Sequence, residues 1–363
     1  MKNFPFLAYS LLSIVVIFQC RIAAEQQRNA AHNGPEPPLL QFGGCGGVYF
    51  LAEPGDFWVE VEKRDIHTTR RNTILRAILV GPDRAVLGDE YLEGNGRVRL
   101  SAMVPRKGIY GLNITVSEDR YGEHIAWGFR SNCPRYLVET SRGHRDAPHE
   151  EPLVLLSPDA SGDICFLPER RAFAVEVSGL PPSGAPVTLH DAADGLIATL
   201  QPDDTGAART EIPVDLSRSN APWRLHLPVF QAVVHVDGVT RWPDGCDYPN
   251  LSLWTPHAAS WFPFHENRWL ITPYSRTIYA DAGEHGTATF EVHNNAFVER
   301  RYALSLEFPD QPWNLELKDR ELAVPKGESA TVALHFTVPE TGDAWTGHVR
   351  VTPLDTPDLC TYA

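Results

Sequence analysis

Two stretches of the chain carry the same residue pattern at one constant offset. In the first, residues 47–51 read Gly-Val-Tyr-Phe-Leu and residues 57–61 read Phe-Trp-Val-Glu-Val. In the second, residues 163–167 read Asp-Ile-Cys-Phe-Leu and residues 173–177 read Phe-Ala-Val-Glu-Val. Phe and Val recur at every second position, which is the period of a β-strand with one buried face. The repeat therefore predicts two homologous all-β units.

Further alternating segments occupy corresponding places in the two copies, and short turn sequences follow them. They are 76–80 with 186–190 and 110–114 with 223–227. Many short strands joined by turns are typical of β-sandwiches, and a content of 30 Pro and 27 Gly fits that class better than a helical bundle. We predict two homologous jelly-roll-like or immunoglobulin-like sandwiches at 39–140 and 150–250, with a polar linker between them.

A third β-sandwich is expected at 266–363. An alternating segment ends in two Asn at 294–295, Pro-Trp stands at 312–313, Val-Pro-Lys-Gly-Glu at 324–328 and Phe-Thr-Val-Pro at 336–339. This order resembles the immunoglobulin-like domains appended to bacterial secreted glycosidases and surface proteins. The resemblance implies a fibronectin-type sandwich with an accessory role. It covers the last part of the chain, and its motifs are turn and core signals that say little about function.

The beginning of the chain predicts export. Residues 1–24 have the pattern of a signal peptide, with a basic start, an apolar stretch over 4–18 and Ala-Ala before the cleavage point. Cys20 leaves lipidation open as an alternative, although Gln precedes it where a lipobox has a small residue. Residues 25–38 are polar and are expected to be a disordered spacer. We expect a secreted protein, whether extracellular, periplasmic or on the cell surface.

The cysteines are placed as two pairs around the two copies. Cys45 and Cys133 bracket the first copy, and Cys165 and Cys246 bracket the second. Export permits disulfides, so we predict one bridge within each copy. Buried free thiols are the alternative, since they are common in sandwich cores. Cys360 is left without a partner, and no Cys spacing favours a structural zinc site.

The charge of the chain restricts its partners. The formal net charge is −14, which repels nucleic acid and anionic lipid. No segment after the leader is long and apolar enough to be read as a membrane-spanning helix. We expect a glycan or a protein as partner, no nucleic acid and no membrane span.

The sequence offers no linear signature of catalysis. There is no Gly-x-Ser-x-Gly elbow. Glu60 and Glu62 could form a carboxylate pair for glycoside hydrolysis, but Glu176 repeats the same place and favours a solvated outer face. Residues 159–163 resemble a fragment of a calcium loop, although an ordinary turn explains them more simply. No His spacing favours zinc, and we predict neither a catalytic residue nor a metal or cofactor.

Aromatic residues gather at the junction of the second and third units, with a few polar residues among them. Stacked rings beside polar groups are what a sugar needs, so this set is the candidate ligand site. Packing between rigid domains is the competing explanation. The candidate residues are Trp242, Trp254, Trp261, His265, Glu266, Trp269 and Tyr274.

Three functions follow from these observations. The first is a secreted or surface-associated, non-catalytic binding or accessory protein, with a glycan as one ligand class. The second is a carbohydrate-active or other hydrolytic enzyme whose site is assembled at a domain junction. The third is a structural component of the cell envelope.

Overall fold

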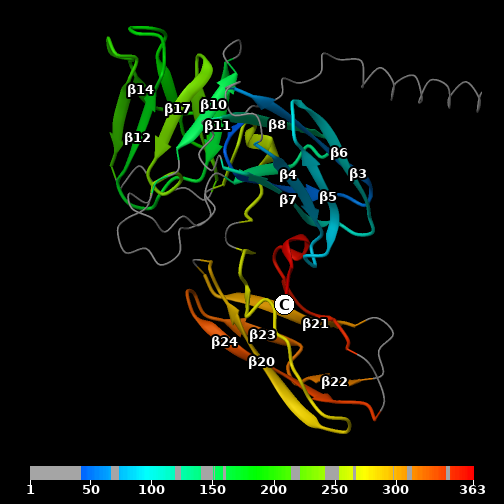
Figure 1. The fold of residues 1–363 in the computed structure, drawn as a ribbon. Helices are drawn as coiled ribbons and strands as arrows, with labels where there is room; N and C mark the ends of the chain where they lie inside the picture. Colours follow the sequence, from blue (N-terminus) through cyan, green and yellow to red (C-terminus); the bar gives the residue numbers. More distant parts are fainter. Residues whose placement is uncertain are drawn as a thin grey trace, which may run out of the picture. The chain divides into compact units, whose positions relative to one another are not determined.

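The protein is all-β, as its alternating sequence predicted (Figure 1). Within the part of the chain described by the structure, a computed structural model, the only helical turns are the 3-10 segments η1 (Ala258–Ser260) and η3 (Pro357–Leu359) and residues near 267. No helix in that part is long and apolar enough to cross a membrane. The described residues are 42–66, 73–118, 124–139, 150, 152–157, 161–213, 221–241, 253–264, 267–296, 298–308, 313–340 and 344–363. The expected signal peptide and spacer lie outside them.

Two large antiparallel sheets contain both copies of the repeat. The eight-stranded sheet has the order β15 (Ala208–Ile212), β12 (Phe173–Ser178), β17 (Phe230–Val236), β10 (Leu153–Ser157), β1 (Phe42–Gly43), β8 (Ile125–Ser131), β3 (Gly55–Asp65) and β6 (Gly96–Val104). The ten-stranded sheet has the order β14 (Leu196–Leu200), β13 (Val187–His190), β16 (Trp223–Leu227), β11 (Gly162–Phe166), β18 (Leu253–Thr255), β9 (Tyr136–Glu139), β2 (Gly46–Ala52), β7 (Gly108–Val116), β4 (Leu75–Val80) and β5 (Val86–Leu92).

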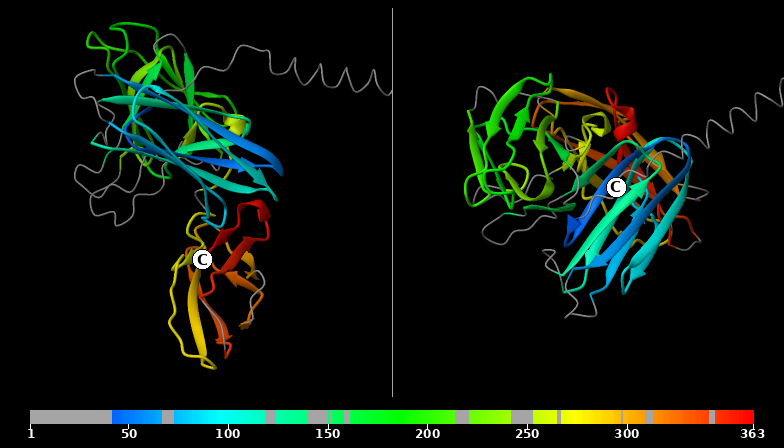
Figure 2. Two further views of the ribbon diagram at one scale, coloured as in Figure 1. Left: turned by 45° about the vertical axis from the view of Figure 1, so that its right-hand side comes forward. Right: turned by 90° about the horizontal axis from the view of Figure 1, so that it is seen from above.

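The strand order repeats within each sheet. In the first copy the order from the free edge is β6-β3-β8-β1 in one sheet and β5-β4-β7-β2-β9 in the other. The second copy has β15-β12-β17-β10 and β14-β13-β16-β11-β18, which is the same order with every strand number raised by nine. Figure 2 shows the strands of the first copy in blue to blue-green and those of the second in green, except β18, which is yellow. The repeat in sequence is thus also a repeat in topology.

The two copies are joined edge to edge. β1 pairs with β10 through Phe42 and Leu155, and β9 pairs with β18 through Val138 and Trp254. We call these two strand pairs the seam. One cluster of buried side chains runs from Phe42 to Trp254 through both copies. This continuity was not predicted, because the sequence suggested separate sandwiches. Of the linker expected over 140–151, Glu150 is described and forms a β-bridge with Arg241, and the other residues lie outside the described part. The domain limits stay a prediction.

Burial follows the period of two that the sequence showed. Phe57 and Val61 of β3 are 3% and 0% exposed, and their counterparts Phe173 and Val177 of β12 are 3% and 1% exposed. The intervening Glu60 of β3 lies directly across from an arginine of β6, and the same holds for β12 and β15. The alternation therefore directs the repeated Phe and Val residues into the core and the repeated Glu outward.

A second core belongs to the end of the chain. One four-stranded sheet has the order β19 (Ile271–Thr272), β20 (His285–His293), β24 (Ser329–Thr337) and β22 (Asn314–Leu317). The other has the order β23 (Glu321–Val324), β21 (Arg300–Glu307), β25 (His348–Pro353) and β26 (Thr361–Tyr362). Buried residues from both sheets form one cluster, which is the sandwich expected there.

A small third cluster covers the outer face of the ten-stranded sheet at the seam. Leu51, Leu137 and Leu253 from β2, β9 and β18 pack there with Phe262 and Phe264. Their strand neighbours, among them Phe50, Val138 and Trp254, belong instead to the large core. The sheet is therefore buried on both faces at this place, which explains why all three residues of β18 are buried.

The predicted disulfide between Cys45 and Cys133 is wrong, because both residues are free thiols. Cys45 directly precedes β2, and its sulfur accepts a hydrogen bond from the backbone N–H of Val116. The sulfur of Cys133 donates to the backbone oxygen of Leu51, which lies near the other end of β2. About six residues of extended strand, about 20 Å, separate these places, and a disulfide needs Cα atoms about 4.4–6.8 Å apart.

The second predicted bridge also fails. Cys165 is a buried free thiol in β11, and Cys246 lies outside the described residues. Cys165 corresponds to Tyr49 in the repeat, so the cysteines of the two copies do not occupy equivalent positions. Burial raises the pKa of the Cys165 thiol to about 12, with a smaller contribution from Asp163, which makes it unreactive.

Candidate functional site

The structure divides the aromatic residues of the junction into buried and exposed groups. Trp254 is fully buried, and Trp261 packs half-buried against the third cluster. Trp269 and Tyr274 are 40% and 46% exposed. Trp242, His265 and Glu266 lie outside the described residues. Among the described candidates, Trp269 and Tyr274 are the ones that offer largely exposed ring faces to a ligand.

Trp254 belongs to the core of the seam. It pairs with Val138 of β9 on one side and with Phe166 of β11 on the other. Its ring meets Phe42 edge-on with centroids 5.8 Å apart. Trp261 contributes its backbone oxygen to Arg135 at 2.8 Å. The packing explanation therefore fits both residues. Trp254 is fully buried and cannot contact a ligand directly.

Trp269 and Tyr274 form an exposed aromatic surface with two arginines. The ring centroids are 4.8 Å apart at an interplanar angle of 52°. The guanidinium carbon of Arg268 lies 5.0 Å from the Trp269 ring centroid, and that of Arg84 lies 4.4 Å from the Tyr274 ring centroid. We call these four residues the Trp269–Tyr274 surface. It presents apolar ring faces and positive charge side by side.

The backbone holds this surface in place. Leu270 and Ile271, between the two rings in sequence, are both 0% exposed and anchor the segment in the core of the last sandwich. The backbone N–H of His293 donates to the Leu270 oxygen at 2.8 Å. Trp269 itself has φ 61°, which is uncommon for a bulky residue, and its side chain remains 40% exposed. The rings are therefore held by rigid, buried neighbours.

Arg268 is anchored by a carboxylate. Its Nη1 donates to the Tyr49 hydroxyl at 2.7 Å and to Glu139 Oε1 at 3.1 Å, and the Tyr49 hydroxyl donates to Glu139 Oε2 at 2.8 Å. Glu139 is only 5% exposed. A buried carboxylate is tolerated when it is paired and hydrogen-bonded, and this one has both partners. The charge of Arg268 is thus balanced within the protein.

Arg84 has no such partner among the described residues. It lies in the turn between β4 and β5 at φ 66°, and its Nη1 donates to the backbone oxygen of Tyr274 at 2.8 Å. No described carboxylate forms an ion pair with it. Although the residue is exposed, its guanidinium packs against the Tyr274 ring. This local burial lowers the pKa of the guanidinium, and the nearby charge of Arg268 lowers it further.

Two other exposed arginine–aromatic pairs differ from this arrangement. Arg76 lies 5.1 Å from the Tyr91 ring centroid, and Arg99 lies 4.2 Å from that of Trp58. Asp89 forms an ion pair with Arg76 at 2.5 Å, and Glu60 forms one with Arg99 at 3.3 Å. In those pairs the arginine charge is already neutralised on the protein surface.

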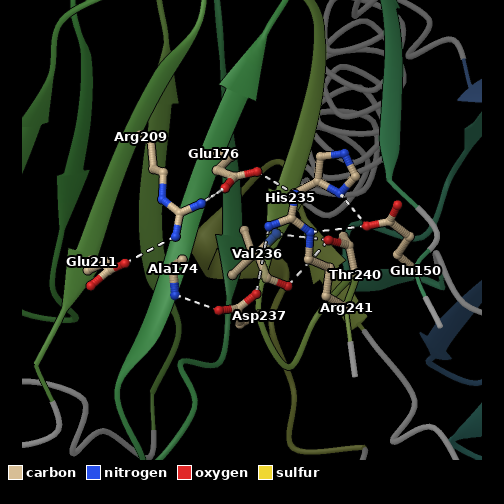
Figure 3. Close-up of polar contacts among 10 residues, drawn as sticks. All are labelled: Glu150, Ala174, Glu176, Arg209, Glu211, His235, Val236, Asp237, Thr240 and Arg241. Carbon is tan, nitrogen blue, oxygen red and sulfur yellow. Dashed lines mark hydrogen bonds and ion pairs between the residues drawn. The ribbon is translucent and has the colours of Figure 1, made fainter. Parts of the chain in front are cut away.

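The repeated glutamates form ion-pair networks on the eight-stranded sheet. Figure 3 shows Glu176 of β12 between Arg209 and Arg241, both of which donate to its carboxylate. Arg241 also donates to Glu150 at 3.2 Å. The hydrogen bond from Arg241 lowers the pKa of Glu176, and burial opposes this only in part. A general acid needs a raised pKa, so this carboxylate is suited to structure rather than to proton donation.

In the first copy Glu60 is surrounded in the same way, with Arg99 at 3.3 Å, Arg130 at 3.8 Å and Arg97 at 4.0 Å. Glu62 departs from the solvated face expected for it, because it is only 8% exposed. Arg97 bonds it at 2.7 Å and Arg64 at 2.8 Å. These glutamates are not a free carboxylate pair.

His235 is the histidine of the network in Figure 3. It lies on β17 across from Glu176, and its Nδ1 is 3.8 Å from Glu150. Burial lowers the pKa of the imidazole, and the charge of Arg241 lowers it further. Three nearby carboxylates raise the pKa of the imidazole, but the net pKa remains lowered. They are Glu150, Glu176 and Asp237.

A shallow polar hollow of about 240 Å³ lies on the sheet that contains β20, β24 and β22. His285 Nδ1 is 2.8 Å from the Thr337 hydroxyl, and His335 Nδ1 is 2.9 Å from the Thr287 hydroxyl. Small-molecule sites are larger, about 300–1,000 Å³, and mostly apolar. No group of three His, Cys, Asp or Glu in the described part of the chain is arranged to hold a metal ion.

Sequence reasoning found both exposed rings but missed Arg84. The turn in which it lies was recognisable from Gly-Pro-Asp at 81–83, yet Arg84 is 190 residues from Tyr274 in the chain. No local pattern connects the two. The contact exists only because the β4–β5 turn meets the segment that follows β19.

Comparisons with known proteins leave the family open. No family model matches the chain, and no curated protein matches its sequence. Among solved structures it is similar to Escherichia coli alpha-2-macroglobulin activated by porcine elastase, with 10% identity over 88% of this chain and a TM-score of 0.21. The chain covers 31% of that protein's length. A similarity at this level supports no inference about function.

Proposed function

We propose that this protein is a secreted or surface-associated, non-catalytic protein that binds a saccharide on the Trp269–Tyr274 surface. One observation carries the proposal: two exposed rings lie 4.8 Å apart, flanked by two guanidinium groups and fixed by buried neighbours. Such a surface is ready to bind without rearrangement, which reduces the entropic cost of association.

A saccharide fits this chemistry. The C–H face of a sugar ring is apolar and packs on aromatic side chains, while its hydroxyls need hydrogen-bond partners. Arginine N–H groups beside the rings supply such donors. An accessory role for the whole chain is part of this proposal.

The polar groups of the described surface favour binding over hydrolysis. Glu139, the described carboxylate that pairs with Arg268, is already held by Tyr49 and Arg268. It is therefore not available as the free general acid or base that glycoside hydrolysis requires. The hydrolase alternative rests on His265 and Glu266, which the experiment below addresses directly.

The test compares variants against a panel of soluble polysaccharides. Affinity electrophoresis measures binding, and release of reducing ends measures cleavage. Trp269→Ala and Tyr274→Ala should each weaken binding by about 2–10-fold, which corresponds to about 0.5–1.5 kcal/mol for an aromatic contact. Tyr91→Ala is the matched control, because Tyr91 is 55% exposed and also has an arginine over its ring.

Three results would count against the proposal. Unchanged binding in both ring variants would show that the surface is not the site. Absence of binding to any polysaccharide would favour a protein partner or a structural envelope role. Cleavage that disappears in Glu266→Gln or His265→Ala would establish the hydrolase instead.

A further inference from the structure

We propose that the saccharide bound by the Trp269–Tyr274 surface is acidic, and that Arg84 receives its carboxylate or sulfate group. This inference rests on the proposed function and names the ligand class for the same surface. Arg84, rather than Arg268, is the residue that distinguishes an acidic from a neutral sugar.

The first step is the charge balance of the two arginines. Arg268 is paired at 3.1 Å with a carboxylate that is 5% exposed, so its charge is neutralised inside the protein. Arg84 meets a ring and a backbone oxygen but no described carboxylate. The surface therefore carries one positive charge that no described carboxylate balances.

The second step is the donors that remain on Arg84. A guanidinium has five N–H donors in a planar fork, and Arg84 uses Nη1 for the Tyr274 oxygen. The remaining donors can form paired hydrogen bonds with the two oxygens of a carboxylate or sulfate. Because the guanidinium is 4.4 Å from the centroid of the Tyr274 ring, one sugar can contact both groups.

The third step is the electrostatic state of the free protein. Arg84 is packed against the Tyr274 ring, and this local burial acts against its charge. Arg268 adds a smaller unfavourable contribution although it is paired with Glu139. An anionic ligand removes this cost, and a neutral ligand does not. The net charge of −14 is no obstacle, because charges farther away than about 8 Å are largely screened at physiological salt.

The experiment uses pairs of polysaccharides that share a backbone and differ in charge. Polygalacturonate is compared with its methyl-esterified form, and dextran sulfate with dextran. Titration calorimetry of the mature chain should show at least about 10-fold tighter binding of the acidic member in one pair, the expected size of a charge-assisted hydrogen bond. The pair that shows the preference identifies the carboxylate or the sulfate.

Three variants separate this inference from the proposed function. Arg84→Gln should abolish the preference for the acidic polysaccharide, because the affinity for the acidic member falls to that for the neutral one when the charge is removed. Arg84→Lys should keep part of the preference, because it keeps the charge. Arg76→Gln is the matched control: it also removes a guanidinium over a tyrosine ring, but one that Asp89 already neutralises.

Equal affinity for acidic and neutral members in the wild-type protein would overturn the inference, as would a preference that survives Arg84→Gln. In either case, weaker binding in Tyr274→Ala would leave the proposed function standing. If Tyr274→Ala binds every polysaccharide like the wild-type protein, the proposed function fails and the inference fails with it.

Discussion

Replacing Trp254 with alanine should destabilise both copies of the repeat together. Trp254 is fully buried and lies on β18, which pairs with β11 of its own copy and with β9 of the other. Its side chain buries about 200 Å², and at about 25 cal/mol per Å² that gives about 5 kcal/mol as an upper limit. Trp→Ala substitutions in cores cost about 3–5 kcal/mol. We expect a loss in that range.

The assay combines two measurements. Urea unfolding gives the loss of stability, and hydrogen exchange read by mass spectrometry shows where protection is lost. Strands β7 and β16 are counterparts in the first and second copies, and neither contacts Trp254 through backbone pairing. Because the two copies share both sheets and one core, protection should fall by a similar factor in β7 and β16.

Trp345→Ala serves as the control, because Trp345 is 42% exposed and its loss should change stability by no more than about 0.5 kcal/mol. Loss of protection in β16 with β7 unchanged would refute the reasoning. It would show that the copies unfold as separate sandwiches despite their continuous sheets. Two resolved unfolding transitions for the two copies in the wild-type protein would lead to the same conclusion.

Three further outcomes are expected. Alkylation of the denatured, unreduced protein should label at least four thiols, as measured by intact mass. Fewer labelled thiols would show that a disulfide is present. The four free thiols are Cys45, Cys133, Cys165 and Cys360. Gly206→Ala should lower the urea midpoint while Gly94→Ala does not, because Gly206 has φ +79° and a Cβ there would lie 2.1 Å from the Leu180 oxygen. The fold disfavours protonated His235, whose pKa is lowered by burial and then by Arg241. Stability should therefore decrease as pH falls through the ordinary histidine value of about 6.5, and His235→Asn should reduce this dependence. An equal pH slope in both proteins would contradict the assignment.

The strands could be predicted because they depend on local alternation. Phe57 and Phe173 stand at the same place in a period-two pattern, and both are buried as that pattern requires. The seam could not be predicted. β1 has only two residues, and its pairing with β10 joins Phe42 to Leu155 across more than a hundred residues of sequence. Such pairings depend on tertiary packing, which local propensity does not record.

The cysteine prediction failed for a related reason. Positions that bracket a repeat in sequence need not be close in space, because the two ends of an extended strand are far apart. Cys45 and Cys133 lie toward opposite ends of β2, and each sulfur is hydrogen-bonded to the backbone there. Symmetry of spacing along the chain is therefore weak evidence for a bridge unless strand directions are known.

The aromatic junction shows how one segment can serve both packing and binding. Sequence density alone could not separate the two roles, because Trp, Phe and Tyr suit either. The structure separates them by what lies behind each ring. Phe262 and Phe264 cover the outer face of the seam, where Leu253 needs a partner on the side away from the large core.

A few residues later the chain enters the last sandwich through the buried Leu270 and Ile271. Trp269 and Tyr274 flank this buried pair and remain exposed, so packing has fixed their positions without using their outer faces. These two rings are not part of a core, but their backbone is fixed by buried neighbours, so they are well placed to contact a ligand. Arg84 lies beside them and pairs with no described carboxylate, which is the reason to expect that ligand to carry a negative charge.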